Sequence, residues 1–162
     1  MKVFTLRRVQ HLPVTAEDAW AFFSAASNLD KITPPEMRFK IVSQLNDEPV
    51  YSHMLIEYKV KPILGITMKW VTEITDVNPP HKFKDIQLKG PFAMWEHTHH
   101  FQSVAGGVKM TDEVKYALPL GWLGIIFHTL LIQNKLTQIF DFRTVALKRL
   151  FGEINNKKYV GG

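Results

Sequence analysis

Short segments with strand-like patterning follow one another between residues 37 and 117, joined by brief turn sequences. The connections include Gly90-Pro91 and Ala105-Gly106-Gly107, whose residue types favour turns. Such links are too short for the crossovers that parallel neighbours need, so the pattern predicts an antiparallel meander. The expected strands are 37–44, 51–61, 66–78, 81–89, 92–103 and 107–117, with a further alternating strand at 2–11.

Helical patterns lie on both sides of this meander. Thr15 can cap a helix over 16–25, and a second short helical turn is expected at 28–33. After Gly121 the apolar period changes from two residues to about 3.6, which predicts a long helix ending near Gly152. One stripe of this helix carries Ile132, Leu136, Ile139, Phe140, Arg143, Leu147 and Leu150. Helices gathered on one face of an antiparallel sheet make an α+β fold.

The bulk properties exclude several classes of protein. The 162 residues suit one core, and we expect a single domain over 1–153 with a polar tail over 154–162. Cysteine is absent, which excludes disulfides, thiolate metal sites and cysteine nucleophiles. The net charge is +5, but the basic residues are dispersed and no exposed aromatic ladder accompanies them. We therefore expect no nucleic acid partner.

The location of the protein is inferred from its apolar segments. No secretory signal pattern is visible, so we expect a cytoplasmic protein. The most apolar stretch, 117–132, is too short and too interrupted to span a bilayer. A peripheral membrane contact through this stretch stays open, and the oligomeric state is not fixed by the sequence.

The last two predicted strands carry the most informative polar residues. Clean alternation from 108 to 116 sends one apolar set of side chains inward, and Asp112 belongs to that set. The hairpin register that keeps all inward residues on one side pairs Phe101 with Met110, His99 with Asp112, His97 with Val114 and Trp95 with Tyr116. An imidazole and a carboxylate are therefore expected to be neighbours in the interior.

The preceding strand adds further polar groups. A turn at Gly90-Pro91 aligns Phe83, Asp85 and Gln87 with His99, His97 and Trp95, respectively. A shift of one residue would place Asp85 opposite Glu96, and repulsion between like charges disfavours that register. The predicted interior thus holds Asp85, Gln87, His97, His99, Asp112 and, from the helix stripe, Arg143. This many polar groups indicate a wet or ligand-lined cavity rather than a dry core.

Several interpretations of these polar groups remain open. His99 and Asp112 fit a structural ion pair, a proton-transfer pair or, with His97, part of a metal site. Because two histidines at this spacing are weak evidence, we expect no metal and no cofactor. Arg143 fits either a side chain that reaches solvent or a partner of Asp112 or of a ligand anion. The remaining histidines are interpreted as surface residues: His11, His53, His81, His100 and His128.

Sequence motifs along most of the chain form a recognisable set. They are 13–23 (PVTAEDAWAFF), 28–35 (NLDKITPP), Trp70-x-Thr72-x-Ile74, Pro79-Pro80-x-x-Phe83-x-Asp85, Gly90-Pro91 with Trp95-x-His97-x-His99-x-Phe101, Asp112-x-Val114-x-Tyr116-x-Leu118-Pro119, and Phe140-Asp141-Phe142-Arg143. Together they resemble the START/Bet v 1-like superfamily, also called SRPBCC or polyketide cyclase-like, and within it the bacterial ligand-binding branch. The resemblance covers roughly residues 2–152. It implies a helix-grip fold, in which a curved seven-stranded antiparallel sheet surrounds a long C-terminal helix, with two short helices near the N-terminus.

This resemblance leads to three hypotheses about function. The first is a carrier or sensor that binds a small hydrophobic ligand, such as a lipid, polyketide or quinone, in an internal cavity. The second is a cyclase, dehydratase or isomerase on a polyketide-like substrate, with His99 as a base set by Asp112 and with His97 or Arg143 stabilising an enolate. The third is a membrane- or protein-associated adaptor that uses the apolar segment 118–132. The expected ligand-binding residues are Trp70, Asp85, Gln87, Trp95, His97, His99, Phe101, Met110, Asp112, Tyr116, Ile139, Phe140 and Arg143.

Overall fold

A curved antiparallel sheet forms one layer of the computed structural model, which describes residues 1–45, 48–61, 65–127 and 131–154. Within this described part, seven strands follow the order β1-β7-β6-β5-β4-β3-β2. Consecutive strands from β2 to β7 are neighbours, and β1 pairs with β7, which confirms the predicted meander. The strands are β1 (Phe4–Leu12), β2 (Lys40–Ile41), β3 (Leu55–Val60), β4 (Met68–Asn78), β5 (Lys82–Lys89), β6 (Met94–Val104) and β7 (Gly107–Ala117).

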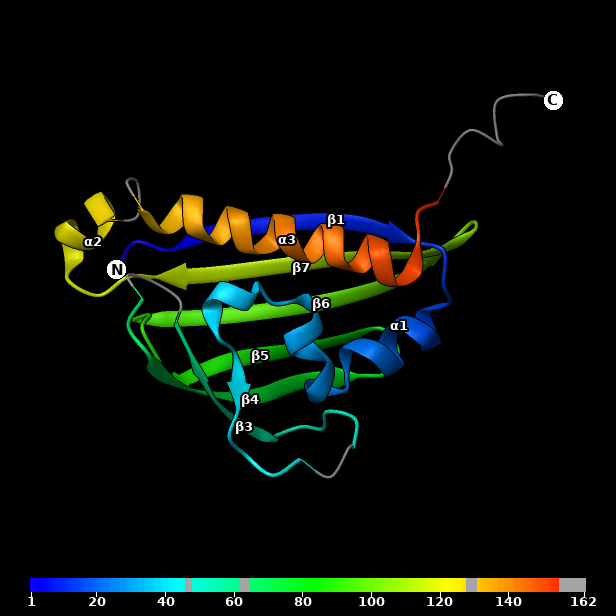
Figure 1. Ribbon diagram of the computed structural model, residues 1–162, viewed down its shortest axis with the longest axis horizontal. Coiled ribbons are helices and arrows are strands. Elements are labelled where there is room, and N and C mark those ends of the chain that lie inside the picture. The colour runs from blue at the N-terminus through cyan, green and yellow to red at the C-terminus, as the bar shows by residue number, and fades with distance from the viewer. Residues whose placement is uncertain (46–47, 62–64, 128–130, 155–162) are drawn as a thin grey trace.

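The helices cover one face of this sheet (Figure 1). The long helix α3 contacts β1 and η1, and α1 contacts β6 and β7. This arrangement confirms the predicted α+β, helix-grip fold. The helical elements are α1 (Ala16–Phe23), η1 (Ala26–Ile32), η2 (Pro35–Met37), α2 (Gly121–Phe127) and α3 (Gln133–Phe151).

Local sequence signals explain the start and end of α1. The Thr15 hydroxyl accepts a hydrogen bond from the Asp18 backbone N–H at 3.0 Å, and the Asp18 carboxylate accepts one from the Thr15 backbone N–H at 3.4 Å. This reciprocal cap satisfies backbone donors that the first turn leaves unpaired. The helix ends at Phe23, two residues earlier than predicted, because Ala25 adopts an extended conformation before η1 begins.

Two predicted strands are shorter than the alternation indicated. The segment 37–44 contains only the two-residue strand β2, because η2 occupies its start and Arg38 has a left-handed backbone (φ 46°). In 51–61 the strand begins at Leu55, because the Met54 N–H donates to the Tyr51 carbonyl and closes a turn. The alternating side chains in both segments had suggested longer strands, but local turns replace the hydrogen bonds between strands there.

The register of the central strands agrees with the sequence-based prediction. The β6–β7 ladder pairs Phe101 with Met110, His99 with Asp112, His97 with Val114 and Trp95 with Tyr116. The β5–β6 ladder pairs Asp85 with His97 and Phe83 with His99. The predicted pairing of Gln87 with Trp95 does not occur, because this ladder ends at the pair Ile86–Glu96. The Gln87 amide instead donates to the Phe92 carbonyl at 2.8 Å and closes the turn between the strands.

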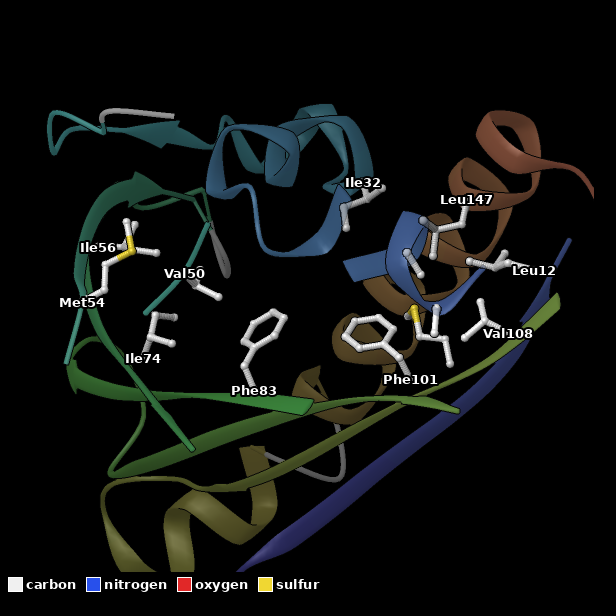
Figure 2. Close-up of a cluster of buried hydrophobic side chains, with 13 residues drawn as sticks. Leu12, Ile32, Val50, Met54, Ile56, Ile74, Phe83, Phe101, Val108 and Leu147 are labelled. Atoms are coloured by element: carbon white, nitrogen blue, oxygen red, sulfur yellow. The ribbon is translucent and has the colours of Figure 1, made fainter. Parts of the chain in front are cut away.

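Apolar side chains fill the space between the sheet and the helices at one end of the fold. In Figure 2, Phe83 and Phe101 project from the sheet toward the helical layer that carries Ile32 and Leu147. A second cluster around Trp70, which includes Phe140 of α3, fills the other end. The buried polar residues described next lie on β5, β6, β7 and α3, the same elements that supply much of both clusters.

Candidate functional site

A cavity of about 160 Å³ lies between the inner face of the sheet and the helices η1 and α3. Aromatic and aliphatic side chains form most of its wall, among them Trp70, Phe83, Trp95 and Phe140. Several wall residues are only half-buried, among them Leu29 on η1 and Lys135 and Ile139 on α3, so the cavity is not fully enclosed. Its shape and apolar lining are typical of a small-molecule site.

One side of the cavity carries a buried cluster of charged and polar side chains. His97 Nε2 donates to Asp112 Oδ1 at 2.9 Å, and His99 Nε2 donates to Asp85 Oδ2 at 3.3 Å. His99 Nδ1 lies 2.9 Å from Asp112 Oδ1, and His97 Nδ1 lies 3.6 Å from Asp85 Oδ2. Arg143 Nη1 approaches Asp112 Oδ1 to 3.7 Å from the helix side. Each imidazole therefore contacts both carboxylates.

The hydrogen bonds of this cluster run diagonally across the strands. His99 is the backbone partner of Asp112, yet the hydrogen bond to Asp112 comes from His97, two residues away on β6. Likewise Asp85 is opposite His97 but bonds to His99. Diagonal neighbours in an antiparallel pair are within reach of long side chains, so correct register alone did not identify the bonded partners.

Ring packing fixes the orientation of both imidazoles. The His97 and His99 ring centroids lie 3.9 Å apart, and Phe83 stacks on the outer face of His99 at 4.3 Å. Phe140 meets His97 edge-on at 5.6 Å, and the Arg143 guanidinium lies 4.9 Å above the same phenyl ring. These contacts hold the nitrogen atoms in fixed directions, as a preorganised site requires.

The charges of the cluster shift the pKa values of its members in different directions. Burial acts to raise the pKa of Asp112, but the close imidazoles of His97 and His99 and the charge of Arg143 hold that pKa well below the ordinary value. For Asp85, the His99 hydrogen bond likewise outweighs burial and lowers the pKa. Burial lowers the pKa of His97, aided by repulsion from His99. For His99 the two carboxylates outweigh burial and raise the pKa, so the two imidazoles differ in proton affinity.

Two residues of the cavity wall, Trp70 and Arg143, carry N–H donors that make no hydrogen bond to the described residues. Trp70 Nε1 and Arg143 Nε and Nη1 are buried and have no hydrogen bond to any of the residues that the structure describes. An unpaired buried donor costs about 1–3 kcal/mol, and more when it is charged. Because both residues lie in the cavity wall, an acceptor oxygen on a bound molecule would satisfy them.

Comparison with solved structures identifies the fold. No family model matches the sequence, and no curated protein sequence matches it. The di-domain ARO/CYC BexL from the BE-7585A biosynthetic pathway is 15% identical, with a TM-score of 0.70 over 94% of this chain and 51% of that chain. Protein CV1439 from Chromobacterium violaceum is 12% identical, with a TM-score of 0.68 over 93% of this chain and 98% of that one. Ara h 8.0201, of the Bet v 1 family, is 15% identical, with a TM-score of 0.56 over 91% and 99%. The chain has the START/Bet v 1-like fold.

The wall of the cavity includes many of the residues that were expected to bind a ligand. Those in its wall are Trp70, Asp85, Trp95, His97, His99, Ile139, Phe140 and Arg143. Arg143 is buried and meets Asp112, so the predicted contact between them is present and the side chain does not reach solvent.

The other expected residues face inward but do not line this cavity. They are Gln87, Phe101, Met110, Asp112 and Tyr116. Phe101 and Met110 are packed in the core cluster, and Tyr116 belongs to the second cluster. Asp112 lies behind the two histidines, where it borders a smaller cavity on the α3 side. Strand parity places all five on the inner face, but the helices that cover that face decide which of them reach the cavity.

Parts of the wall were not anticipated. Tyr58 lines the cavity, and burial, together with the nearby Asp85 charge, raises its pKa well above the ordinary value. Thr72 shares the inward face of β4 with Trp70, a signal that alternation could have supplied. Leu29 and Lys135 enter from η1 and α3, and only the folded chain brings these segments to the cavity.

Residues assigned to the surface are found there. The exposed histidines are His11, His53, His81 and His100, whereas His128 lies outside the described residues, as does most of the expected C-terminal tail. In the segment behind the adaptor hypothesis, Leu120, Trp122 and Ile126 are exposed by 68%, 70% and 47%. None of the described helices combines the length and apolar character that a membrane span needs.

Proposed function

We propose that the protein binds a small, largely apolar molecule that carries at least one hydrogen-bond-accepting oxygen, as a carrier or sensor of that molecule. The observation behind this proposal is the pairing of an apolar cavity with unsatisfied donors, Trp70 Nε1 and the Arg143 guanidinium, in its wall. Apolar pockets with a few placed polar groups are the usual form of small-molecule sites.

The size of the cavity restricts what it can enclose. A dry apolar cavity of roughly 150 Å³ is large enough for benzene, so about 160 Å³ encloses one aromatic ring or a short hydrocarbon segment. A second ring or a longer chain would extend toward half-buried wall residues such as Lys135. The ligand chemistry that fits is therefore a ring with an oxygen substituent, as in lipids, polyketides and quinones with polar ends.

Binding of two matched molecules tests this proposal. We expect the protein to bind 2-naphthol with 1:1 stoichiometry and roughly tenfold more tightly than naphthalene, because one satisfied hydrogen bond is worth about 1 kcal/mol or more. Trp70→Phe keeps an aromatic ring but removes a donor, and should reduce this preference. Trp122→Phe, at an exposed indole outside the cavity wall, is the matched control and should keep it. Isothermal titration calorimetry measures both affinities, and failure of either molecule to bind at a single site would contradict the proposal.

A cyclase or isomerase is the second candidate function, and the observation that favours it is the position of two imidazoles in the cavity wall. His97 and His99 each contact a carboxylate and each border open space, as a proton-transfer group must. An imidazole there could take a proton from the carbon next to a carbonyl group, while the electron pair moves to the carbonyl oxygen near Arg143. The likeness to the ARO/CYC BexL supports this candidate at the level of the fold.

Hydrogen–deuterium exchange tests this second candidate. Metal-free protein in D₂O should accelerate exchange of the central protons of an aryl 1,3-diketone, measured by NMR. His97→Gln or His99→Gln should lower the rate by at least tenfold, since general base catalysis typically contributes about 10²-fold or more. His100→Gln, on the opposite face of β6, should leave it unchanged. Equal rates with and without protein would remove this candidate and leave the binding proposal intact.

A further inference from the structure

We propose that Asp85, His97 and His99 form a binding site for one divalent transition-metal ion, with Zn²⁺ as the best fit. One ligand atom from each of these residues lies within 4.8 Å of the other two. This metal site lies in the cavity wall, and its test is independent of the proposed ligand because metal binding is measured on the protein alone.

The distances match those around a tetrahedral ion. Asp85 Oδ2 lies 3.3 Å from His99 Nε2 and 3.6 Å from His97 Nδ1. Ligand atoms about 2.1 Å from a tetrahedral zinc ion lie about 3.4 Å from one another. The ligand atoms of the two histidines lie within 4.8 Å of each other, so an ion bound to all three residues would draw the two imidazoles into place around it.

Asp112 supplies the outer contacts that metal-binding histidines need. It accepts a hydrogen bond from His97 Nε2 at 2.9 Å, and His99 Nδ1, a buried nitrogen without a hydrogen bond to the described residues, lies 2.9 Å from the same oxygen. Metal-bound histidines almost always donate the remaining ring N–H to a carboxylate or carbonyl, which fixes the tautomer and the ring orientation. The hydrogen bond from His97 to Asp112 directs the lone pair of His97 Nδ1 toward Asp85, and an ion bound at His99 Nε2 would replace the proton that this nitrogen donates to Asp85.

The position of the trio relative to the cavity is also that of an open metal site. Asp85, His97 and His99 line the cavity, whereas Asp112 does not. An ion with these three ligands would keep a further coordination position toward the cavity, where an oxygen of a bound molecule can complete it. Two nitrogen ligands and one carboxylate suit zinc and related transition metals better than Mg²⁺ or Ca²⁺.

The charges around the trio favour a cation. The buried carboxylates of Asp85 and Asp112 face one permanent positive charge, that of Arg143, which leaves an excess negative charge in the interior. Isolated buried charge is costly, so a proton on an imidazole or a metal ion must offset it. The experiment below separates these two possibilities.

Metal titration of the untagged, EDTA-treated protein tests the site. We expect one equivalent of Zn²⁺ to stay bound through gel filtration, measured by mass spectrometry of the eluted metal. Co²⁺ should give the visible absorption of a four-coordinate ion. His99→Ala and Asp85→Asn should each weaken binding by at least about 100-fold, because each removes one of only three protein ligands. The controls His53→Ala and His100→Ala, at exposed histidines, should bind as the unaltered protein does.

Two further measurements separate ligation from folding. Asp112→Asn should weaken Zn²⁺ binding by about 10–100-fold while leaving the Co²⁺ spectrum of the loaded protein nearly unchanged, because the metal ligands themselves are intact. In the unaltered protein, diamagnetic Zn²⁺ should shift the NMR signals of the His97 and His99 rings far more than those of His100, a measurement that requires no variant to fold. Absence of stoichiometric Zn²⁺ binding, or full retention of it by His99→Ala, would overturn the proposal. Naphthol binding by the EDTA-treated protein tests the binding proposal independently of this result.

Discussion

The variant Asp112→Ala is expected to lose about 3–5 kcal/mol of unfolding free energy, the largest loss expected for any single residue of the polar cluster. Asp112 is 2% exposed and lies within 4 Å of His97, His99 and Arg143. Removing its carboxylate leaves a guanidinium and two imidazoles in the interior without their shared acceptor. Breaking a buried ion pair from one side costs far more than the pair contributes when intact, because the remaining charge stays buried.

Urea unfolding of the EDTA-treated protein measures this loss without any contribution from metal. The matched control is Glu113→Ala, the next residue on β7, which faces the opposite side of the sheet and whose carboxylate pairs with Lys115 among the described residues. Its side chain is 34% exposed, so the expected change is within about 0.5 kcal/mol. Asp112→Asn should fall between the two, since the amide oxygen still accepts from one imidazole. Equal losses for Asp112→Ala and Glu113→Ala would show that the cluster does not stabilise the fold.

Asp112 also shows which features of the site the alternation of strand side chains can predict and which it cannot. Alternation on β7 and a turn at Gly106-Gly107 were sufficient to pair His99 with Asp112 and to place both inside. The hydrogen bond to Asp112 nevertheless comes from His97, because imidazoles reach diagonally across the ladder. Register is a property of the backbone pattern, whereas the bonded partner depends on rotamers that the surrounding rings impose.

Which inward residues reach the cavity depended on contacts between distant segments. Phe101 and His99 lie on the same face of β6, but α1 covers Phe101 through Trp20 and Phe23, while His99 remains in the cavity wall. No pattern within β6 distinguishes them. The short strand β2 was misjudged for a related reason, since the left-handed Arg38 breaks a segment whose alternation was otherwise strand-like.

Two other wall residues, Lys135 on α3 and Tyr58 on β3, also reach the cavity through contacts between distant segments. Lys135 lies on the first turn of α3 and lines the cavity. Tyr58 lines the far wall from β3. The periodicity of apolar residues and the turn sequences were enough to predict the fold class. Which residues form the cavity wall depends on how η1 and α3 pack against the sheet, and no sequence pattern shows that packing.

The variant Ala26→Trp is expected to abolish measurable naphthol binding, with a loss of affinity of at least about tenfold. Ala26 lies on η1 in the cavity wall and packs against the core cluster. An indole at this position would occupy a large share of a cavity of about 160 Å³, so the ring of a ligand would have no room. Filling a cavity commonly stabilises a protein by about 0.5–2 kcal/mol when the new side chain fits. Loss of binding should therefore occur without loss of the folded state.

The adjacent variant Ser27→Trp is the control for this experiment. Ser27 is exposed and does not belong to the described cavity wall, so an indole there adds the same surface without entering the cavity. Calorimetric titration with 2-naphthol should give unchanged affinity for Ser27→Trp and no detectable heat for Ala26→Trp. Circular dichroism and thermal unfolding confirm that both variants are folded. Retained binding by a folded Ala26→Trp protein would place the ligand outside the cavity, because no rearrangement short of opening η1 could accommodate both rings. The comparison thus separates a molecule held between sheet and helices from one adsorbed to the exposed side chains of α2.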